Sequence, residues 1–168
     1  LLERQADPEA ADKRSWRPLF HAVRRGDLAM VDVLLKQGAD PDAPDRYGIT
    51  PLMFAAGTGR VDLMKSLLES GAEIDTMDKR RGFTALMGAV WNNQVEAVTL
   101  LLDKGANVSL QEVSGSYTPL SRAGYREYWD VVKILMEHGA VCQPVEIVGD
   151  WLFKECTKRE RALKGTAN

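Results

Sequence analysis

The sequence predicts an all-α fold, a solenoid of stacked helix–turn–helix units joined by β-hairpin-like finger loops. The first observation is a three-residue motif, clearest as Thr50-Pro51-Leu52. Its copies recur at intervals of 33, 34 and 34 residues and begin at Arg17, Thr50, Thr84 and Thr118. A second motif, Gly-Ala plus one residue, recurs at the same intervals from Gly38, Gly71, Gly105 and Gly139. Two independent motifs with one period indicate a repeat architecture.

Each unit is expected to contain two short helices, as the second unit illustrates. Thr50 is suited to cap the first helix, because its hydroxyl accepts from a free N–H, and Pro51 fits the first helical position. Gly59 predicts the end of this helix. The second helix has an apolar stripe of helical period at Val61, Met64, Leu67 and Leu68. Gly71 ends it at a position that favours left-handed backbone, and stacked units would bury the two apolar faces together.

The period divides the chain into a stack with two different ends. The predicted units are 15–44, 45–77, 78–111 and 112–142. Residues 1–14 are charged and are expected to be a frayed segment or a partial helix. Residues 143–168 have an apolar side at helical spacing and are expected to form a capping helix and tail. Arg126-Glu127-Tyr128 stands in place of a glycine turn in the fourth unit, so a distorted turn is expected there.

These units resemble ankyrin repeats, whose pattern is D-x-x-G-x-T-P-L-H-x-A-A followed by a helix that ends L-L-x-x-G-A-D. The second unit, DRYGITPLMFAAGTGRVDLMKSLLESGAEID, matches this pattern almost throughout. The resemblance implies a module that binds proteins and is not an enzyme. The slot of the family's histidine holds Phe20, Met53, Met87 and Ser121, so we expect the hydrogen bond of that histidine to be absent.

Composition narrows the classes of partner. The 168 residues are enough for one domain with a real core, and a net charge of −2 predicts no bulk attraction to nucleic acid or anionic membrane. No apolar run approaches the 18 residues or so that a membrane-spanning helix needs. Two cysteines do not make a disulfide framework, which favours an intracellular setting, cytoplasmic or nuclear. We expect the chain to be monomeric by itself.

No motif predicts catalysis, a cofactor or a metal. His21 is expected to be a packed core histidine. His138, Cys142 and Cys156 supply too few ligands for a closed zinc site, and Gly139 would end the helix that aligns the first two. Gly57-Thr58-Gly59 lacks the lysine of a phosphate-binding loop.

The slots that vary between units predict the binding surface. They are the finger tips and two positions at the end of each first helix, which together would line the concave face. The first of these helix positions holds Arg24, Gly57, Trp91 and Tyr125, and the third finger has an additional residue at Arg80-Arg81. The predicted partner-binding residues are Arg25, Arg46, Tyr47, Lys79, Arg80, Arg81, Phe83, Trp91, Asn92, Tyr117, Tyr125 and Arg126. Trp, Tyr and Arg are the types that dominate binding hot spots.

This chemistry predicts a protein or peptide partner with acidic residues and a bulky apolar anchor seated between Trp91 and Tyr125. Two structural alternatives stay open, namely Trp91 as core and the arginines as a solvated rim. A second function is a regulatory domain that docks within a larger protein, such as a channel, kinase or other enzyme, and the absence of an initial Met favours this. A third is an aromatic cage for methylated lysine, which requires Trp91, Tyr125 and Tyr117 to face one point.

Overall fold

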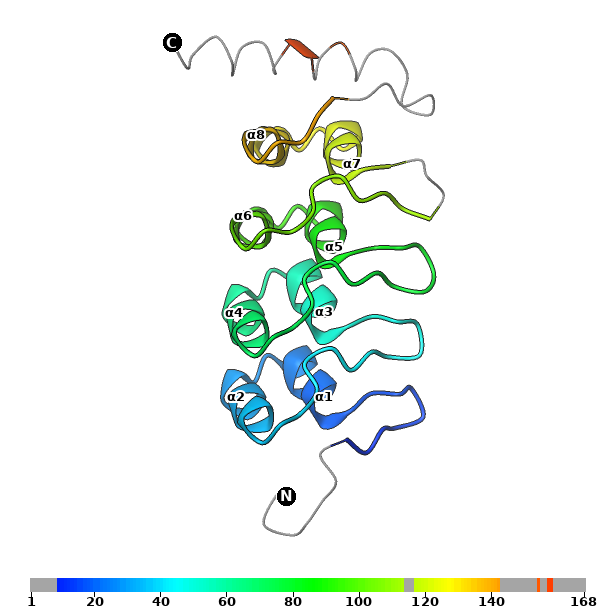
Figure 1. Cartoon of the computed structure of the whole chain (residues 1–168), viewed down its shortest axis with the longest axis vertical. Coiled ribbons are helices and arrows are strands. Elements are labelled where there is room, and N and C mark those ends of the chain that lie inside the picture. The colour runs from blue at the N-terminus through cyan, green and yellow to red at the C-terminus, as the bar shows by residue number, and fades with distance from the viewer. Residues whose placement is uncertain (1–8, 114–116, 143–153, 155–156, 159–168) are drawn as a thin grey trace.

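A computed structural model describes residues 9–113, 117–142, 154 and 157–158. Within these residues the chain forms four helix pairs stacked along one axis, with finger loops projecting on one side (Figure 1). The first helices of the pairs are α1 (Pro18–Arg25), α3 (Pro51–Gly57), α5 (Ala85–Trp91) and α7 (Pro119–Tyr125). The second helices are α2 (Leu28–Lys36), α4 (Val61–Glu69), α6 (Val95–Asp103) and α8 (Trp129–Glu137). The predicted all-α solenoid is confirmed.

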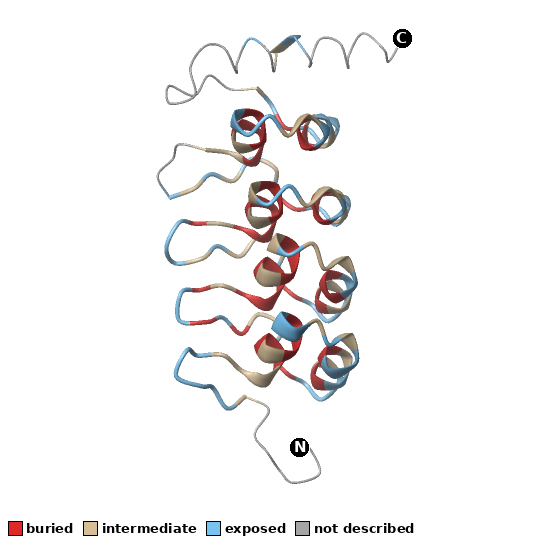
Figure 2. Cartoon of the chain, turned by 180° about the vertical axis from the view of Figure 1, so that it is seen from behind, coloured by how far each residue is buried: buried red, intermediate tan, exposed pale blue. Residues whose placement is uncertain are grey.

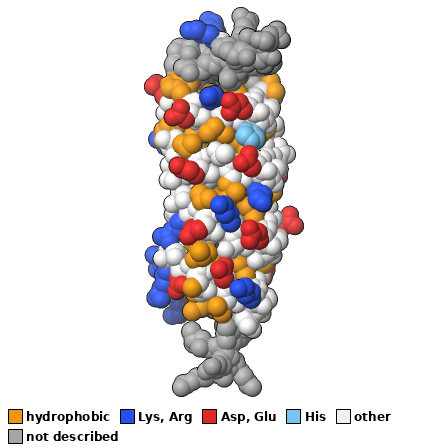
Figure 3. Space-filling view, turned by 90° about the vertical axis from the view of Figure 1, so that its left-hand side faces the viewer, with side chains coloured by type: hydrophobic (Ala, Val, Ile, Leu, Met, Phe, Trp, Pro, Cys, Tyr) orange, Lys and Arg blue, Asp and Glu red, His pale blue; other side chains and the backbone are white. Residues whose placement is uncertain are grey.

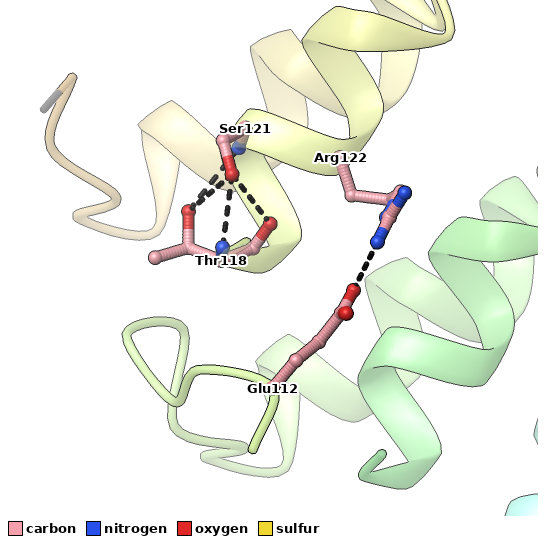
Figure 4. Close-up of polar contacts among 4 residues, drawn as sticks. All are labelled: Glu112, Thr118, Ser121 and Arg122. Carbon is pink, nitrogen blue, oxygen red and sulfur yellow. Dashed lines mark hydrogen bonds and ion pairs between the residues drawn. The ribbon is translucent and has the colours of Figure 1, made fainter. Parts of the chain in front are cut away.

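Side-chain caps begin three of the first helices. The hydroxyls of Thr50, Thr84 and Thr118 each accept from the backbone N–H three residues later at 3.2 Å. In two units the residue at the histidine slot accepts a backbone hydrogen bond at the cap. Ser121 Oγ accepts from Thr118 N–H at 2.9 Å (Figure 4), and the thioether of Met53 accepts from Thr50 N–H at 3.4 Å. A short hydroxyl or a long thioether therefore replaces the imidazole.

The core lies between the two helices of each pair and between neighbouring pairs. In the second unit Leu52, Leu63, Met64 and Leu67 have no exposed surface. Figure 2 shows this distribution, with buried segments facing neighbouring helices and exposed segments at the finger tips. Small residues such as Ala55 let the first helices approach one another. Burial at about 25 cal/mol per Å² of apolar surface is thus shared between units, so no unit has a complete core alone.

The turn between the two helices is the same in all four units. Its central residue has positive φ in each case, at Gly26 (76°), Gly59 (68°), Asn93 (54°) and Glu127 (59°). In the fourth unit Tyr128 N–H donates to Ala123 at 2.9 Å, as Arg60 N–H donates to Ala55 at 2.9 Å in the second. The expected distortion at Glu127 is therefore wrong, because the glutamate adopts the left-handed conformation that glycine adopts in the first two units and asparagine in the third.

The fingers form a connected row. Each finger is closed by a hydrogen bond from the backbone N–H of an acidic residue at its base to a backbone carbonyl. These bonds run from Asp12 to Trp16 (3.0 Å), Asp45 to Ile49 (2.9 Å), Asp78 to Phe83 (2.9 Å) and Glu112 to Tyr117 (3.1 Å). Among the described residues, a backbone hydrogen bond joins each finger to the next, with the N–H groups of Arg46, Lys79 and Val113 donating to the carbonyls of Arg14, Tyr47 and Arg81. Asp12, within the predicted segment 1–14, thus belongs to the first finger.

Several sequence predictions concern the C-terminal region. The predicted capping helix in 143–168 lies almost wholly outside the described residues, as does Cys156. Cys142 is disulfide-bonded, which the composition argument did not anticipate. In the described part of the chain, no helix has the length and apolar character to cross a bilayer, and no group of three or more His, Cys, Asp or Glu side chains is placed to hold a metal ion.

Candidate protein-binding surface

The residue before each cap position and the residue seven positions after the cap, at the end of the first helix, lie together on the finger side. In the first unit, the Arg24 Cζ lies 4.8 Å from the Trp16 ring centroid. In the third and fourth units the centroid distances are 5.7 Å for Phe83 and Trp91 and 6.3 Å for Tyr117 and Tyr125. The second unit has Ile49 and Gly57 at these slots. We call the fingers and these helix ends the finger face.

Trp91 lies within a cluster of arginines. Its half-buried ring has the Cζ atoms of Arg122, Arg126 and Arg81 at 4.7, 5.0 and 5.6 Å from the centroid. Guanidinium groups at such distances are attracted to the electron-rich ring face. Trp91 is thus not a core residue, and the arginines beside it are ordered by aromatic contacts.

A groove of about 480 Å³ runs beside Trp91. It is lined by Arg80, Arg81, Phe83, Trp91, Glu112, Val113 and Arg122. Four of these residues belong to the predicted binding set. Three arginines and one glutamate leave the lining net positive, so an apolar floor lies next to excess positive charge. We call this feature the Trp91 groove.

Sequence analysis missed Glu112 and Arg122, which form a salt bridge at the edge of the groove (Figure 4). Their side chains are only 13% and 14% exposed, so this is not an ordinary surface pair. The guanidinium also lies against Tyr117, with its Cζ 3.7 Å from the ring centroid. The sequence contains a signal for this pair, because the first unit has Asp12 and His21 at the corresponding slots. In the structure these two side chains lie 3.2 Å apart.

Comparison with known families fits this architecture. A family model described as "Ankyrin repeats (3 copies)" matches residues 1–78, 47–112 and 75–145. The chain belongs to the ankyrin-repeat family. Ankyrin repeats generally serve as non-catalytic modules for protein–protein interaction. No curated protein matches the chain.

Other predicted residues connect neighbouring ankyrin repeats. The Tyr47 ring lies between two guanidinium groups, with Arg46 Cζ at 4.8 Å and Arg80 Cζ at 5.1 Å from its centroid. Arg46 and Tyr47 belong to the second finger and Arg80 to the third. Arginine and aromatic side chains therefore alternate along the finger face.

The remaining predicted residues lie outside the Trp91 groove. Arg25 and Lys79 are exposed, and Asn92 Nδ2 donates to the Gly88 carbonyl at 3.1 Å near the end of α5. Tyr125 is exposed and pairs with Tyr117. The groove therefore opens between Trp91 and the fourth finger rather than between Trp91 and Tyr125.

The prediction of a core histidine at His21 is wrong. Its side chain is 45% exposed, and Nε2 lies 3.2 Å from the Asp12 carboxylate, because the first finger folds back over α1. Hydrogen bonds lower the pKa of Asp12, chiefly the one from Trp16 N–H, with a further contribution from His21. The first ankyrin repeat thus has an exposed aspartate–histidine pair where the fourth has a mostly buried glutamate–arginine pair.

The opposite side of the stack, formed by the second helices, has a different character. Figure 3 shows acidic, basic and apolar side chains interspersed over it. Mixed charges of this kind are typical of a solvated surface. The concentration of arginine beside aromatic rings is a property of the finger face.

Proposed function

We propose that the chain binds a protein or peptide segment on its finger face, with an apolar anchor and acidic residues of the partner in the Trp91 groove. The observation that carries this proposal is the Trp91 ring, which three guanidinium groups surround at the edge of a net-positive groove. The family supports the general class of function, since ankyrin repeats bind proteins.

The two parts of the groove suit the two parts of such a partner. Phe83 and Trp91, whose rings are tilted by 53° to each other, offer apolar surface for a bulky side chain. Arg80 and Arg81 are exposed and carry guanidinium forks that pair with carboxylates through two parallel hydrogen bonds. Because the chain as a whole has a net charge of −2, this local excess of positive charge is what would attract an acidic segment.

The geometry disfavours an aromatic cage for methylated lysine. Arginines of the chain already lie over the rings of Trp91 and Tyr117, and they would repel a cationic ammonium group. Docking of a segment from a longer protein would use the same surface as an intermolecular partner. The proposal therefore concerns the chemistry of the occupant in both cases.

Selection from a random peptide library tests the proposal. We expect purified wild-type chain to enrich peptides in which Asp or Glu flanks a Leu, Phe or Trp anchor. Affinity for the enriched peptides, measured by fluorescence polarisation, should fall by about ten- to a hundredfold in a Trp91→Ala, Arg80→Ala, Arg81→Ala variant, as expected for loss of hot-spot residues.

The matched control carries Lys36→Ala and Lys65→Ala, which remove the same number of positive charges from the second helices. This control should bind like wild type. Circular dichroism establishes that each variant is folded. If the folded triple variant bound as tightly as the control, the Trp91 groove would not be the binding site.

A further inference from the structure

The groove contains an acidic group of the chain itself. Glu112 is the single carboxylate among the described residues that line it, and it is paired with Arg122. We propose that Glu112 is a resident competitor, whose carboxylate occupies Arg122 until a carboxylate of the bound peptide replaces it. This inference rests on the proposed function and adds a specific anion subsite that controls its affinity.

Arg122 is held in place by groups other than Glu112. Its Cζ lies 3.7 Å from the Tyr117 centroid and 4.7 Å from the Trp91 centroid, so two rings position the guanidinium. Cation–π contacts are stronger where water is excluded. Movement of Glu112 away from Arg122 would therefore leave the guanidinium at the groove and available to another anion.

The pairing with Glu112 also leaves a buried donor of Arg122 without an acceptor. Glu112 Oε1 accepts from Nη2, whereas the buried Nε–H has no acceptor among the described residues. An unsatisfied buried donor is costly, and a guanidinium edge can serve both oxygens of a carboxylate. A peptide carboxylate that used Nε and Nη2 together would make a better pair than Glu112 does.

Charge favours the same exchange. Arg80 and Arg81 line the groove with Arg122, so a partner with several carboxylates interacts with three guanidinium groups where Glu112 interacts with one. We assign the occupant as the carboxylate of an Asp or Glu side chain, because Glu112 itself shows that a carboxylate fits against Arg122. With internal competition, the apparent affinity equals the intrinsic affinity multiplied by the fraction of chains in which Arg122 is unoccupied.

The test compares two variants that each remove one negative charge from the finger face. Glu112→Gln frees Arg122, whereas Asp78→Asn keeps an acceptor oxygen for the N–H groups of Arg80 and Arg81, both at 2.7 Å from Asp78 Oδ1. The probe is the fluorescein-labelled peptide Glu-Glu-Leu-Glu-Glu, with Gln-Gln-Leu-Gln-Gln as the uncharged control peptide.

We expect Glu112→Gln to bind the glutamate peptide about tenfold more tightly than wild type, which corresponds to about 90% occupancy of Arg122 by Glu112. Asp78→Asn should change affinity by no more than about twofold, since it alters only the general field. In wild type, the NMR signal of the Arg122 Nε–Hε group should shift on addition of the glutamate peptide and not on addition of the glutamine peptide. This measurement does not depend on the stability of any variant.

Distinct results overturn the inference and the proposed function. Suppose that wild type prefers the glutamate peptide, but that Glu112→Gln and Asp78→Asn gain the same affinity or that the Arg122 signal does not respond. Glu112 is then not a competitor, whereas the proposed function stands. If no chain prefers the glutamate peptide to the glutamine peptide, the acidic preference fails, and the competitor with it.

Discussion

The second and fourth repeats share one backbone and differ in how they use the acidic residue at the base of the finger. In the second repeat Asp45 is buried, and its Oδ1 accepts from the N–H groups of Tyr47 and Ile49 at 2.8 and 2.9 Å. In the fourth, Glu112 is one methylene longer and pairs with Arg122, at the helix slot where the second repeat has Phe54. One slot can therefore hold the backbone of its finger or pair with a helix arginine, depending on side-chain length and on the residue opposite.

Removal of the cation from the fourth repeat should have the largest effect on stability. Arg122→Gln leaves Glu112 as a mostly buried charge without its partner, and we expect a loss of about 2–4 kcal/mol in the free energy of unfolding. His21→Gln breaks the equivalent pair of the first repeat, where both side chains are at least 40% exposed, and should have a much smaller effect because solvent screens the pair. Urea denaturation followed by circular dichroism measures both.

The double variant Arg122→Gln, Glu112→Gln sharpens this comparison. Because it removes the stranded charge, it should recover much of the stability lost in Arg122→Gln. Equal losses in Arg122→Gln and His21→Gln would mean that burial does not distinguish the two pairs.

The framework of the fold could be predicted because it repeats. Thr50, Pro51, Gly59 and Gly71 act through local backbone geometry, and each recurrence of the pattern tests the same assignment again. The positions of the aromatic and arginine residues on the finger face were predictable for the opposite reason. These residues differ between units at equivalent positions, whereas the framework residues stay the same. Both kinds of information come from comparing the units within one sequence.

The missing part of the site depends on contacts that a single helix or finger does not reveal. Arg122 lies on α7, one turn before Arg126, which follows that helix. It reaches Glu112 because the fourth finger folds back over the helix. The first finger folds back in the same way, and His21 lies against Asp12 of that finger rather than in the expected core. In the first and fourth repeats an acidic residue lies nine or ten positions before a basic one. That spacing is the sequence signal from which the pair could have been predicted.

The turns of the second and fourth repeats should respond in opposite directions to substitution. Glu127 adopts a φ of 59°, which disfavours a residue with Cβ, so Glu127→Gly should stabilise the chain by about 1 kcal/mol. Gly59→Ala should destabilise it by about 1–2 kcal/mol, because φ is 68° and the new Cβ would lie 2.2 Å from Gln94 Oε1. Thermal denaturation measures the two shifts. Stabilisation by both substitutions would show that the turns do not share one conformation.

The helix ends of the same two repeats differ in a titratable group. Ser70 follows α4, whereas His138 follows α8 and can donate from Nδ1 to the Ile134 carbonyl at 2.8 Å and from Nε2 to Asp103 at 3.2 Å. The bond to Ile134 is the main cause that raises the pKa of His138, and Asp103 adds to it. Because imidazolium has a donor on both nitrogens, the protonated form satisfies both acceptors at once.

The resulting pH dependence should be the smallest of these effects. A raised folded pKa means that the folded chain binds the proton more tightly than the unfolded chain, whose histidine titrates near pH 6.5. The added stability is therefore complete below about pH 6.5 and is lost as pH rises through the folded pKa. Solvent screening limits it to roughly 0.2–1 kcal/mol.

Urea denaturation of wild type and His138→Gln between pH 5.5 and pH 8.5, with the difference plotted against pH, measures this contribution. The wild-type advantage should decline as pH rises. Asp103→Asn should retain part of the decline, because the bond to Ile134 remains and is the larger cause. A difference that grows with pH would mean that His138 is stabilised in its neutral form, since only a lowered folded pKa gives that sign.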